Sequence, residues 1–158
     1  MSWETFFNLL GHMGMERFEW SQNLSIGDEL IDGQHRVWIE KLNDLSNAID
    51  SRRGGDEIFD LLKFMVDYVE SHFLAEEQYM AGQNYPGLER HKLEHSAFCR
   101  MLSDLLALDR TRPGAIETIA SSINNFQIVW LKHHITRTDG LFGEFLRKKG
   151  GSFPGLPS

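Results

Sequence analysis

The sequence has little of what defines several common classes of protein. It contains one cysteine, Cys99, so no disulfide can form within the chain. It has neither an apolar run long enough to span a bilayer nor a cationic amino-terminal segment followed by an apolar run and a cleavage site. Its net charge of -7 opposes binding to nucleic acid or to an anionic membrane, because both need clustered cations. We therefore expect a cytoplasmic protein, and the sequence leaves open a protein partner or a homo-oligomer.

What the sequence does contain is apolar material for one domain. The 158 residues are 41% hydrophobic, which suits a globular domain with a core of useful size. Turn residues gather within the body of the chain at residues 53–55, 82–87 and 112–114. Between these turns the apolar residues recur in steps of three and four, a spacing typical of helices that pack lengthwise.

Four amphipathic helices with short connections predict an all-α protein, an antiparallel up-down four-helix bundle. We expect the bundle over residues 28–149, an N-terminal arm over residues 1–27 and a short flexible C-terminal tail over residues 150–158. In the arm, apolar residues around Trp3 predict a short helix that either packs on the domain's own surface, which we favour because its polar side has no lysine or arginine, or binds a partner or a membrane surface. Trp20 and residues 24–27 are expected to be extended. Either Asp28 or Asp32 is expected to cap the first helix of the bundle.

Histidines and two acidic residues interrupt the apolar stripes of these helices. A lone histidine on such a stripe is usually a core residue bonded to a carbonyl group. Here five of the seven histidines lie on stripes, and Glu76 lies one turn after one of them on the same face. Asp139 follows the last of them by five residues, so we expect it to point inward by reaching across or through a local π-turn. Burying all these groups would be very costly without a common partner, and a metal ion would be such a partner. The candidate metal ligands are His35, His72, Glu76, His91, His95, His134 and Asp139.

The types of ligand narrow the choice of metal. Structural zinc uses four ligands and favours cysteine, whereas magnesium and calcium take oxygen ligands almost exclusively. Five imidazoles and two carboxylates are too many for one ion and indicate two ions bridged by the carboxylates. With one solvent-derived oxygen also shared, two octahedral ions would remain one bond short. One coordination position is therefore expected to be open, on the ion with fewer histidines.

Four motifs in the chain resemble those of the hemerythrins, specifically their bacterial branch. The resemblance runs from about Trp20 to Lys148 and rests on Asp32-Gly33-Gln34-His35, His72-x-x-x-Glu76, Tyr85-Pro86 before His91-x-x-x-His95, and Trp130-x-x-x-His134-Ile135-x-x-x-Asp139. It implies two iron ions in an oxo- or hydroxo-bridged non-haem centre that binds dioxygen reversibly. By the resemblance, the saturated iron would be held by His91, His95 and His134. The open iron would be held by His35 and His72, and Glu76 and Asp139 would bridge the two ions.

Four apolar side chains close to ligands in the sequence are the expected walls of the oxygen pocket, although core packing alone would also place them inside: Trp38, Phe73, Trp130 and Ile135. Trp38 departs from the family, which often has a smaller aliphatic residue at this position. A tryptophan there could narrow the pocket or alter autoxidation.

Some polar residues beside the ligands have less certain roles. Gln34 either accepts a hydrogen bond from a ligand imidazole on a neighbouring helix or faces solvent. Glu77 is expected to be solvated, and His133 to lie at the surface or behind the ligands. Cys99 is expected to be a small buried hydrophobic residue.

Three functions are compatible with such a site. The first is an oxygen carrier, store or delivery protein, and the second is an oxygen- or redox-sensing input module that signals through the arm or tail. The third is a di-iron peroxidase or oxidase that detoxifies oxygen species or nitric oxide. Oxidase-type di-iron bundles use Glu-x-x-His pairs and a carboxylate-rich shell, whereas this site is rich in imidazole. We therefore expect binding without turnover, leaving weak peroxidase or oxidase activity open.

Overall fold

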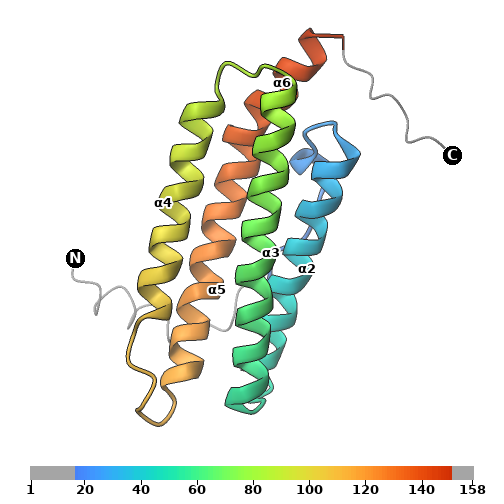
Figure 1. Cartoon of the computed structure of the whole chain (residues 1–158). Coiled ribbons are helices and arrows are strands. Elements are labelled where there is room, and N and C mark those ends of the chain that lie inside the picture. The colour runs from blue at the N-terminus through green and yellow to red at the C-terminus, as the bar shows by residue number, and fades with distance from the viewer. Residues whose placement is uncertain (1–16, 151–158) are drawn as a thin grey trace, which may run out of the picture.

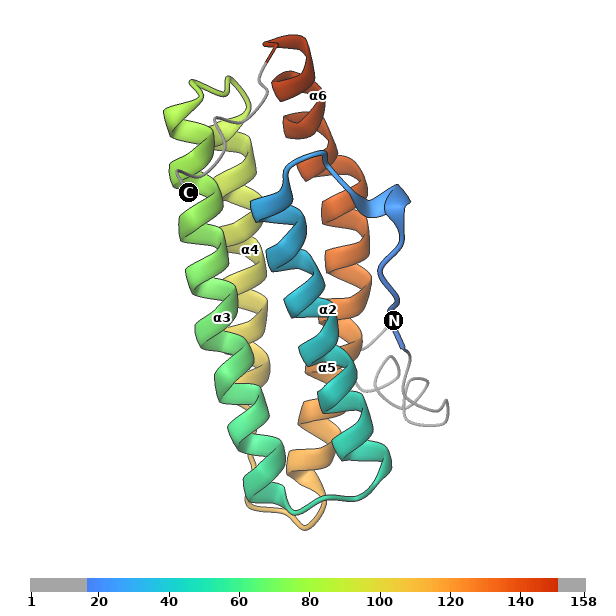
Figure 2. The same cartoon turned by 90° about the vertical axis from the view of Figure 1, so that its right-hand side faces the viewer.

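The computed structural model describes residues 17–150, which form a bundle of four long helices (Figure 1). Successive helices run in opposite directions (Figures 1 and 2). A six-residue π-helix, η2, joins the last long helix to a short terminal helix without a break. The predicted all-α up-down bundle is confirmed, with these bounds: η1 Gln22–Leu24, α2 Glu29–Asp50, α3 Gly55–Gly82, α4 Leu88–Leu106, α5 Ala115–His133, η2 His134–Asp139 and α6 Gly140–Lys148.

The helices begin and end near the turn residues of the sequence. Asp28 is the cap of α2, because its carboxylate accepts a hydrogen bond from the Ile31 amide at 3.0 Å. Before α5, Gly114 has a φ of 76°, in the left-handed region that glycine adopts without strain. Within residues 17–150, none of the helices combines the length and apolar character that a membrane span requires.

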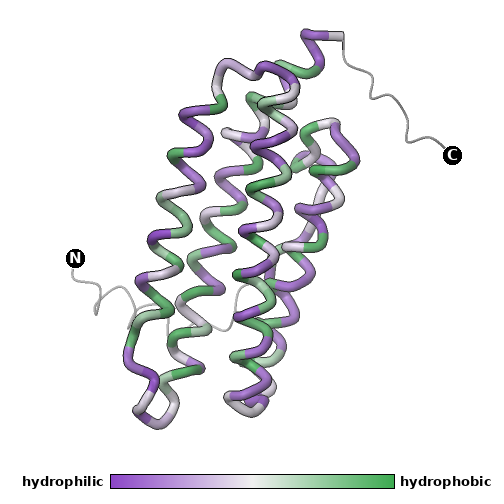
Figure 3. The backbone as a smooth tube through the Cα atoms, viewed as in Figure 1, coloured by the Kyte–Doolittle hydropathy of each residue, from purple (hydrophilic) through white to green (hydrophobic). Residues whose placement is uncertain are grey.

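Two apolar clusters fill the bundle, and the predicted ligands lie between them along every helix. Figure 3 shows hydrophobic and hydrophilic residues interleaved along the helices, as the stripes require. The larger cluster includes Trp38 and Phe98, and the smaller includes Ile31 and Phe142. Since each helix passes from one cluster to the other, the polar groups between them are enclosed from both ends of the bundle.

Residues 17–28, which we call the strap, run beside α2 in the opposite direction to that helix (Figure 2, blue). Asp32, the other predicted cap, instead accepts a hydrogen bond from the Ile26 amide at 2.9 Å. The strap crosses α6 at Gly143, where a Cβ atom would clash with the Ile26 carbonyl oxygen. One turn of 3-10 helix, η1, comes before the segment expected to be extended and shares with it only the buried residue Leu24, and the backbone of Ser25 after it is extended. The helix predicted around Trp3 and the tail beyond residue 150 lie outside the described residues.

Candidate metal centre

The structure brings all seven predicted ligand side chains together at one level of the bundle. Each of these residues is at most 3% exposed, and every one of the four long rods of helix contributes at least one. His35 lies on α2, and His72 and Glu76 lie on α3. His91 and His95 lie on α4, and His134 and Asp139 lie in the π-helix after α5.

The π-helix is what brings Asp139 to this level. In a regular α-helix a residue five positions after His134 would lie about 140° around the axis. The π-helix accommodates one more residue in its turn, and the Asp139 Oδ1 atom lies 3.1 Å from His134 Nε2. The predicted inward direction of Asp139 is therefore confirmed, and of the two expected ways of reaching it the structure contains the local π-turn.

On one side of the centre, which we call the three-histidine side, two carboxylate oxygens face three imidazoles. The Glu76 Oε2 atom lies 3.1 Å from His91 Nε2 and 3.3 Å from His95 Nε2. The Asp139 Oδ1 atom lies 3.1 Å from His134 Nε2. A metal–imidazole bond is about 2.1 Å long, so two bonds at right angles place their donor atoms roughly 3 Å apart. These spacings match donors around one octahedral ion.

On the other side, the two-histidine side, the same carboxylates meet His35 and His72. The Asp139 Oδ2 atom lies 3.2 Å from His35 Nε2, so Asp139 presents one oxygen to each side. Glu76 Oε2 lies 4.0 Å from His72 Nε2. Two groups of potential metal ligands, each with donor atoms within 4.8 Å of one another, have Glu76 in common.

Unpartnered atoms show that these donors fit a metal. Among the described residues, His72 Nε2 and Glu76 Oε1 are buried without a hydrogen-bond partner. His35 has none at either ring nitrogen, since Asp139 is close but out of line. Each buried unsatisfied polar atom costs about 1–3 kcal/mol, and metal coordination would satisfy the atoms that face the centre.

A match to a protein-family model shows the family to which the chain belongs. The model described as "Hemerythrin HHE cation binding domain" matches residues 26–146, which contain all seven of the clustered side chains. The chain belongs to the hemerythrin family.

Curated relatives agree with this membership. A bacteriohemerythrin of Stenotrophomonas maltophilia is 33% identical over 125 residues, which cover 79% of this chain and 78% of that protein. A bacteriohemerythrin of Clostridium acetobutylicum is 30% identical over 128 residues, covering 77% and 95%. A solved structure of a leucine-to-phenylalanine mutant matches with a TM-score of 0.69 and 24% identity, over 84% of this chain and 97% of that one, and this likeness concerns the fold alone.

In this chain, polar side chains outside the centre form hydrogen bonds with three of the five imidazoles. His72 Nδ1 donates to Gln34 Oε1 at 2.8 Å, so of the two roles expected for Gln34 the structure has the support of a histidine on another helix. His95 Nδ1 donates to Glu77 Oε1 at 2.8 Å. A ring that donates from Nδ1 has its lone pair on Nε2, the atom that faces the centre.

Two of these outer partners were missed in the sequence. Glu77 was expected to be solvated, and its side chain is partly exposed, but its carboxylate also accepts a hydrogen bond from His95 on α4. Glu94 accepts from His134 Nδ1 at 3.1 Å and was not singled out at all. A signal existed: both residues are next to a ligand in the chain, as Gln34 is, and the reasoning applied to Gln34 would have selected them.

Two other residues beside the ligands, His133 and Cys99, differ in their exposure. His133 is exposed, as expected for a residue on the outer face of α5. Cys99 is only partly buried, although it packs against the larger apolar cluster.

Opposing nitrogens give a further sign that the centre fits a cation. The Nε2 atoms of His95 and His134 lie 3.1 Å apart. If both rings donate from Nδ1, two lone pairs face each other at this distance and repel unless a cation lies between them.

The electrostatics of the buried groups also fit a cation. Burial lowers the pKa of His72 to about 4, so this ring is neutral and able to coordinate. Burial would raise the pKa of Glu76, but the imidazoles of His91 and His95 beside its carboxylate outweigh burial and hold the pKa well below its ordinary value. Burial and the Glu76 charge also oppose ionisation of Asp139, yet contacts with imidazoles, chiefly His134, lower its pKa to about 2. The centre therefore presents two ionised carboxylates.

Burial alone would lower the pKa of His134, but the Asp139 carboxylate reverses the effect and raises it. A metal ion bound at this position would replace the proton, because a coordinating imidazole must offer a lone pair.

Aromatic side chains pack directly on the imidazoles. Phe73 stacks on His95 with ring centroids 3.6 Å apart, and Trp130 stacks on His134 at 4.1 Å. Trp38 meets His72 edge-on at 5.6 Å. These three of the four predicted wall residues therefore contact ligands on both sides of the centre.

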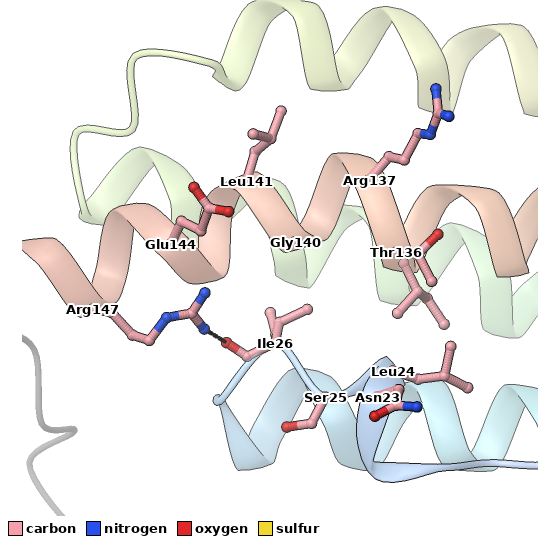
Figure 4. A pocket seen from close by; sticks show the side chains of 11 residues that line it. Asn23, Leu24, Ser25, Ile26, Thr136, Arg137, Gly140, Leu141, Glu144 and Arg147 are labelled. Carbon is pink, nitrogen blue, oxygen red and sulfur yellow. Dashed lines mark hydrogen bonds between the residues drawn. The ribbon is translucent and has the colours of Figure 1, made fainter.

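Two further contacts place the walls. The Trp38 indole donates to Gln127 Oε1 at 3.0 Å, which ties α2 to α5 inside the core. Ile135, the fourth predicted wall residue, is buried and lines a cleft of about 490 Å³ between the strap and the η2–α6 segment. Figure 4 shows this cleft, with the Arg147 side chain bonded to the Ile26 carbonyl across it.

Proposed function

We propose that this protein binds dioxygen reversibly at two iron ions inside the bundle, and so serves as an oxygen carrier, store or delivery protein. The observation that carries the proposal is a completely buried set of imidazoles and carboxylates, spaced as metal ligands, in which Glu76 belongs to two groups of donors. Its membership of the hemerythrin family and its bacteriohemerythrin relatives support the same conclusion.

The donors divide unequally between the two ions in this proposal. The saturated ion would take His91, His95 and His134, and the open ion would take His35 and His72. Glu76 and Asp139 would bridge the two ions. The two-histidine side has one donor fewer, which supports an open position there for a small ligand. Ferrous iron would supply the electrons that dioxygen draws on when it binds and that return when it leaves.

The chain's own residues would keep the binding reversible. The aromatic walls Trp38, Phe73 and Trp130 exclude water from the rings that they cover. Gln34 and Glu77 fix the orientation of two imidazoles from outside the centre. Because a wet or mobile site would admit protons and reductants, these contacts favour binding over turnover.

Cycles of oxygen exposure test the proposal. The protein is loaded anaerobically with ferrous iron, exposed to oxygen and then returned to an oxygen-free atmosphere, while the optical absorption is followed. We expect two irons per chain and recovery of the colourless reduced state over repeated cycles. Irreversible oxidation in the first cycle, or sustained consumption of added peroxide with an electron donor, would instead favour an enzyme.

One contact favours a sensory role as the second candidate. Asp32 lies one turn before His35 and accepts hydrogen bonds from the Ile26 amide and the Ser25 hydroxyl, so the strap is tied directly to the helix turn that carries a ligand. Hydrogen exchange of the strap amides, measured before and after oxygen exposure, distinguishes the roles. A sensor would change the exchange of the strap, whereas a simple carrier would leave it unchanged.

We also expect the protein to act in the cytoplasm, where its single cysteine would stay reduced. Fractionation of cells that produce the full chain tests this expectation.

A further inference from the structure

The two sides of the centre have different partners behind their imidazoles. On the three-histidine side, two rings donate to carboxylates: His95 to Glu77 at 2.8 Å and His134 to Glu94 at 3.1 Å. On the two-histidine side, the described partner is a neutral amide, Gln34. The outer shell of the centre is therefore charged on one side and uncharged on the other.

This difference has an electronic consequence. A carboxylate that accepts a hydrogen bond from Nδ1–H draws the proton towards itself and makes the imidazole more basic at Nε2. A neutral amide oxygen does so more weakly. Each carboxylate also adds a negative charge near its side of the centre, and solvent screens part of that charge, because the side chains of Glu77 and Glu94 are 24% and 38% exposed.

We propose that Glu77 and Glu94 are positioning residues that make the three-histidine side the more electron-rich half, so that its iron is the first to be oxidised. This inference rests on the proposed function, because it requires two irons. If a one-electron oxidant such as ferricyanide removed one electron from the reduced pair, the iron held by His91, His95 and His134 would be the one oxidised. The iron held by His35 and His72 would stay ferrous.

Glu94 has a second contact, through which its structural role can be tested apart from the effect of its charge. Its Oε2 atom also accepts a hydrogen bond from Thr138 Oγ1 at 2.8 Å, within the π-helix. Glu94 therefore ties α4 to the turn that carries His134 and Asp139. Removing the threonine hydroxyl would loosen this tie and leave the charge in place.

Isosteric variants of the iron-loaded protein test the proposal. Glu77→Gln and Glu94→Gln keep the shape of each side chain and remove the charge. Glu89→Gln is the matched control, because Glu89 lies on α4 with a side chain that is 86% exposed and pairs with Lys92. Gln34→Glu makes the converse change, adding a charge behind His72 on the two-histidine side.

The readouts are the reduction potentials of the two one-electron steps and the Mössbauer spectrum of the half-oxidised protein, with circular dichroism as the check of folding. In Glu77→Gln and Glu94→Gln we expect a higher potential for the first oxidation, with roughly tenfold more ferrous protein at a fixed potential. We expect no such change in Glu89→Gln. Gln34→Glu is expected to bring the two steps closer together, and Thr138→Val to lower thermal stability while leaving the potential near that of the wild type.

Equal potentials in the wild type and both glutamine variants would overturn the inference, as would a shift in Glu89→Gln of the same size. If Glu94→Gln does not fold, Glu77→Gln on α3 decides the question. A wild-type chain with fewer than two irons would overturn the proposed function together with this inference. Iron analysis of the wild type distinguishes that failure from one confined to the two glutamates.

Discussion

The two sides of the centre are built in different ways. The three-histidine side takes two ligands from consecutive turns of α4 and a third from the π-helix, and aromatic rings stack face to face on His95 and His134. The two-histidine side takes one ligand each from α2 and α3, and its alignment depends on a hydrogen bond between these helices, from His72 to Gln34. One side is held by local helix geometry and stacking, and the other by the register of two helices. We therefore expect the second side to be lost more easily.

The largest expected effect comes from removing a residue that both sides use. Glu76→Ala takes away the carboxylate that belongs to both groups of donors, so we expect at most one iron per chain. Iron analysis after anaerobic loading is the measurement. Asp67→Ala is the control, because Asp67 lies on the same helix with an exposed side chain paired with Lys63. Two irons per chain in Glu76→Ala would contradict the bridging role.

A smaller effect is expected when only one side is damaged. His72→Ala removes a ligand from the two-histidine side, and we expect the chain to keep one iron, held by the more numerous donors of the three-histidine side. His95→Ala is expected to weaken retention of both irons, because the variant loses the ligand together with its stacking on Phe73 and its hydrogen bond to Glu77. Iron content and visible absorption measure both variants, with His133→Ala on the exposed face of α5 as control. Equal iron losses in the two ligand variants would refute the proposed difference between the sides.

The sequence was sufficient to predict the elements that obey a period. Apolar steps of three and four predicted four helices, and the same steps predicted that His35, His72 and Glu76 face inward. The spacing of five between His134 and Asp139 broke this period, and the break indicated either a side chain that reaches across or the π-turn that the structure contains. Periodicity predicts which face of a helix a residue occupies, because the rise and turn of a helix are fixed.

Contacts that depend on how helices are rotated against each other were harder to predict. Glu77 lies off the ligand face of α3, yet its long side chain reaches a histidine on α4. The bond between Trp38 and Gln127 joins residues 89 positions apart, and no local pattern indicates it. The close crossing at Gly143 likewise depends on where the strap runs. Sequence spacing constrains one helix at a time, whereas these contacts require the relative placement of two.

Trp38 offers a moderate test of the two-histidine side, because it lies against His72 and departs from the family's usual residue. Trp38→Leu should leave a cavity and cost about 2–4 kcal/mol of stability, since a buried indole and its bond to Gln127 are lost. We also expect faster autoxidation of the iron-loaded protein, because the wider pocket admits water and anions. Thermal unfolding measures the first effect and the decay of the oxygen-bound absorption measures the second. An unchanged rate of autoxidation would show that Trp38 serves packing alone.

The smallest effect concerns the strap, which supports the two-histidine side through Asp32. In Gly143→Ala the new methyl group would meet the Ile26 carbonyl, so the strap must shift, at a cost of about 1–3 kcal/mol. Gly33→Ala is the matched control, because a Cβ atom there has nothing within 4 Å and should stabilise α2 by about 0.5–1 kcal/mol. Thermal unfolding measures both.

The direction of any metal effect then sharpens the comparison of the two sides. The strap is bonded to the carboxylate one turn before His35, so its shift in Gly143→Ala should reach the two-histidine side first. We expect the second iron of this variant to be removed faster by a chelator, while the first iron leaves at the wild-type rate. Equal acceleration for both irons would mean that the strap supports the bundle as a whole, and the sides would then differ only in their ligands.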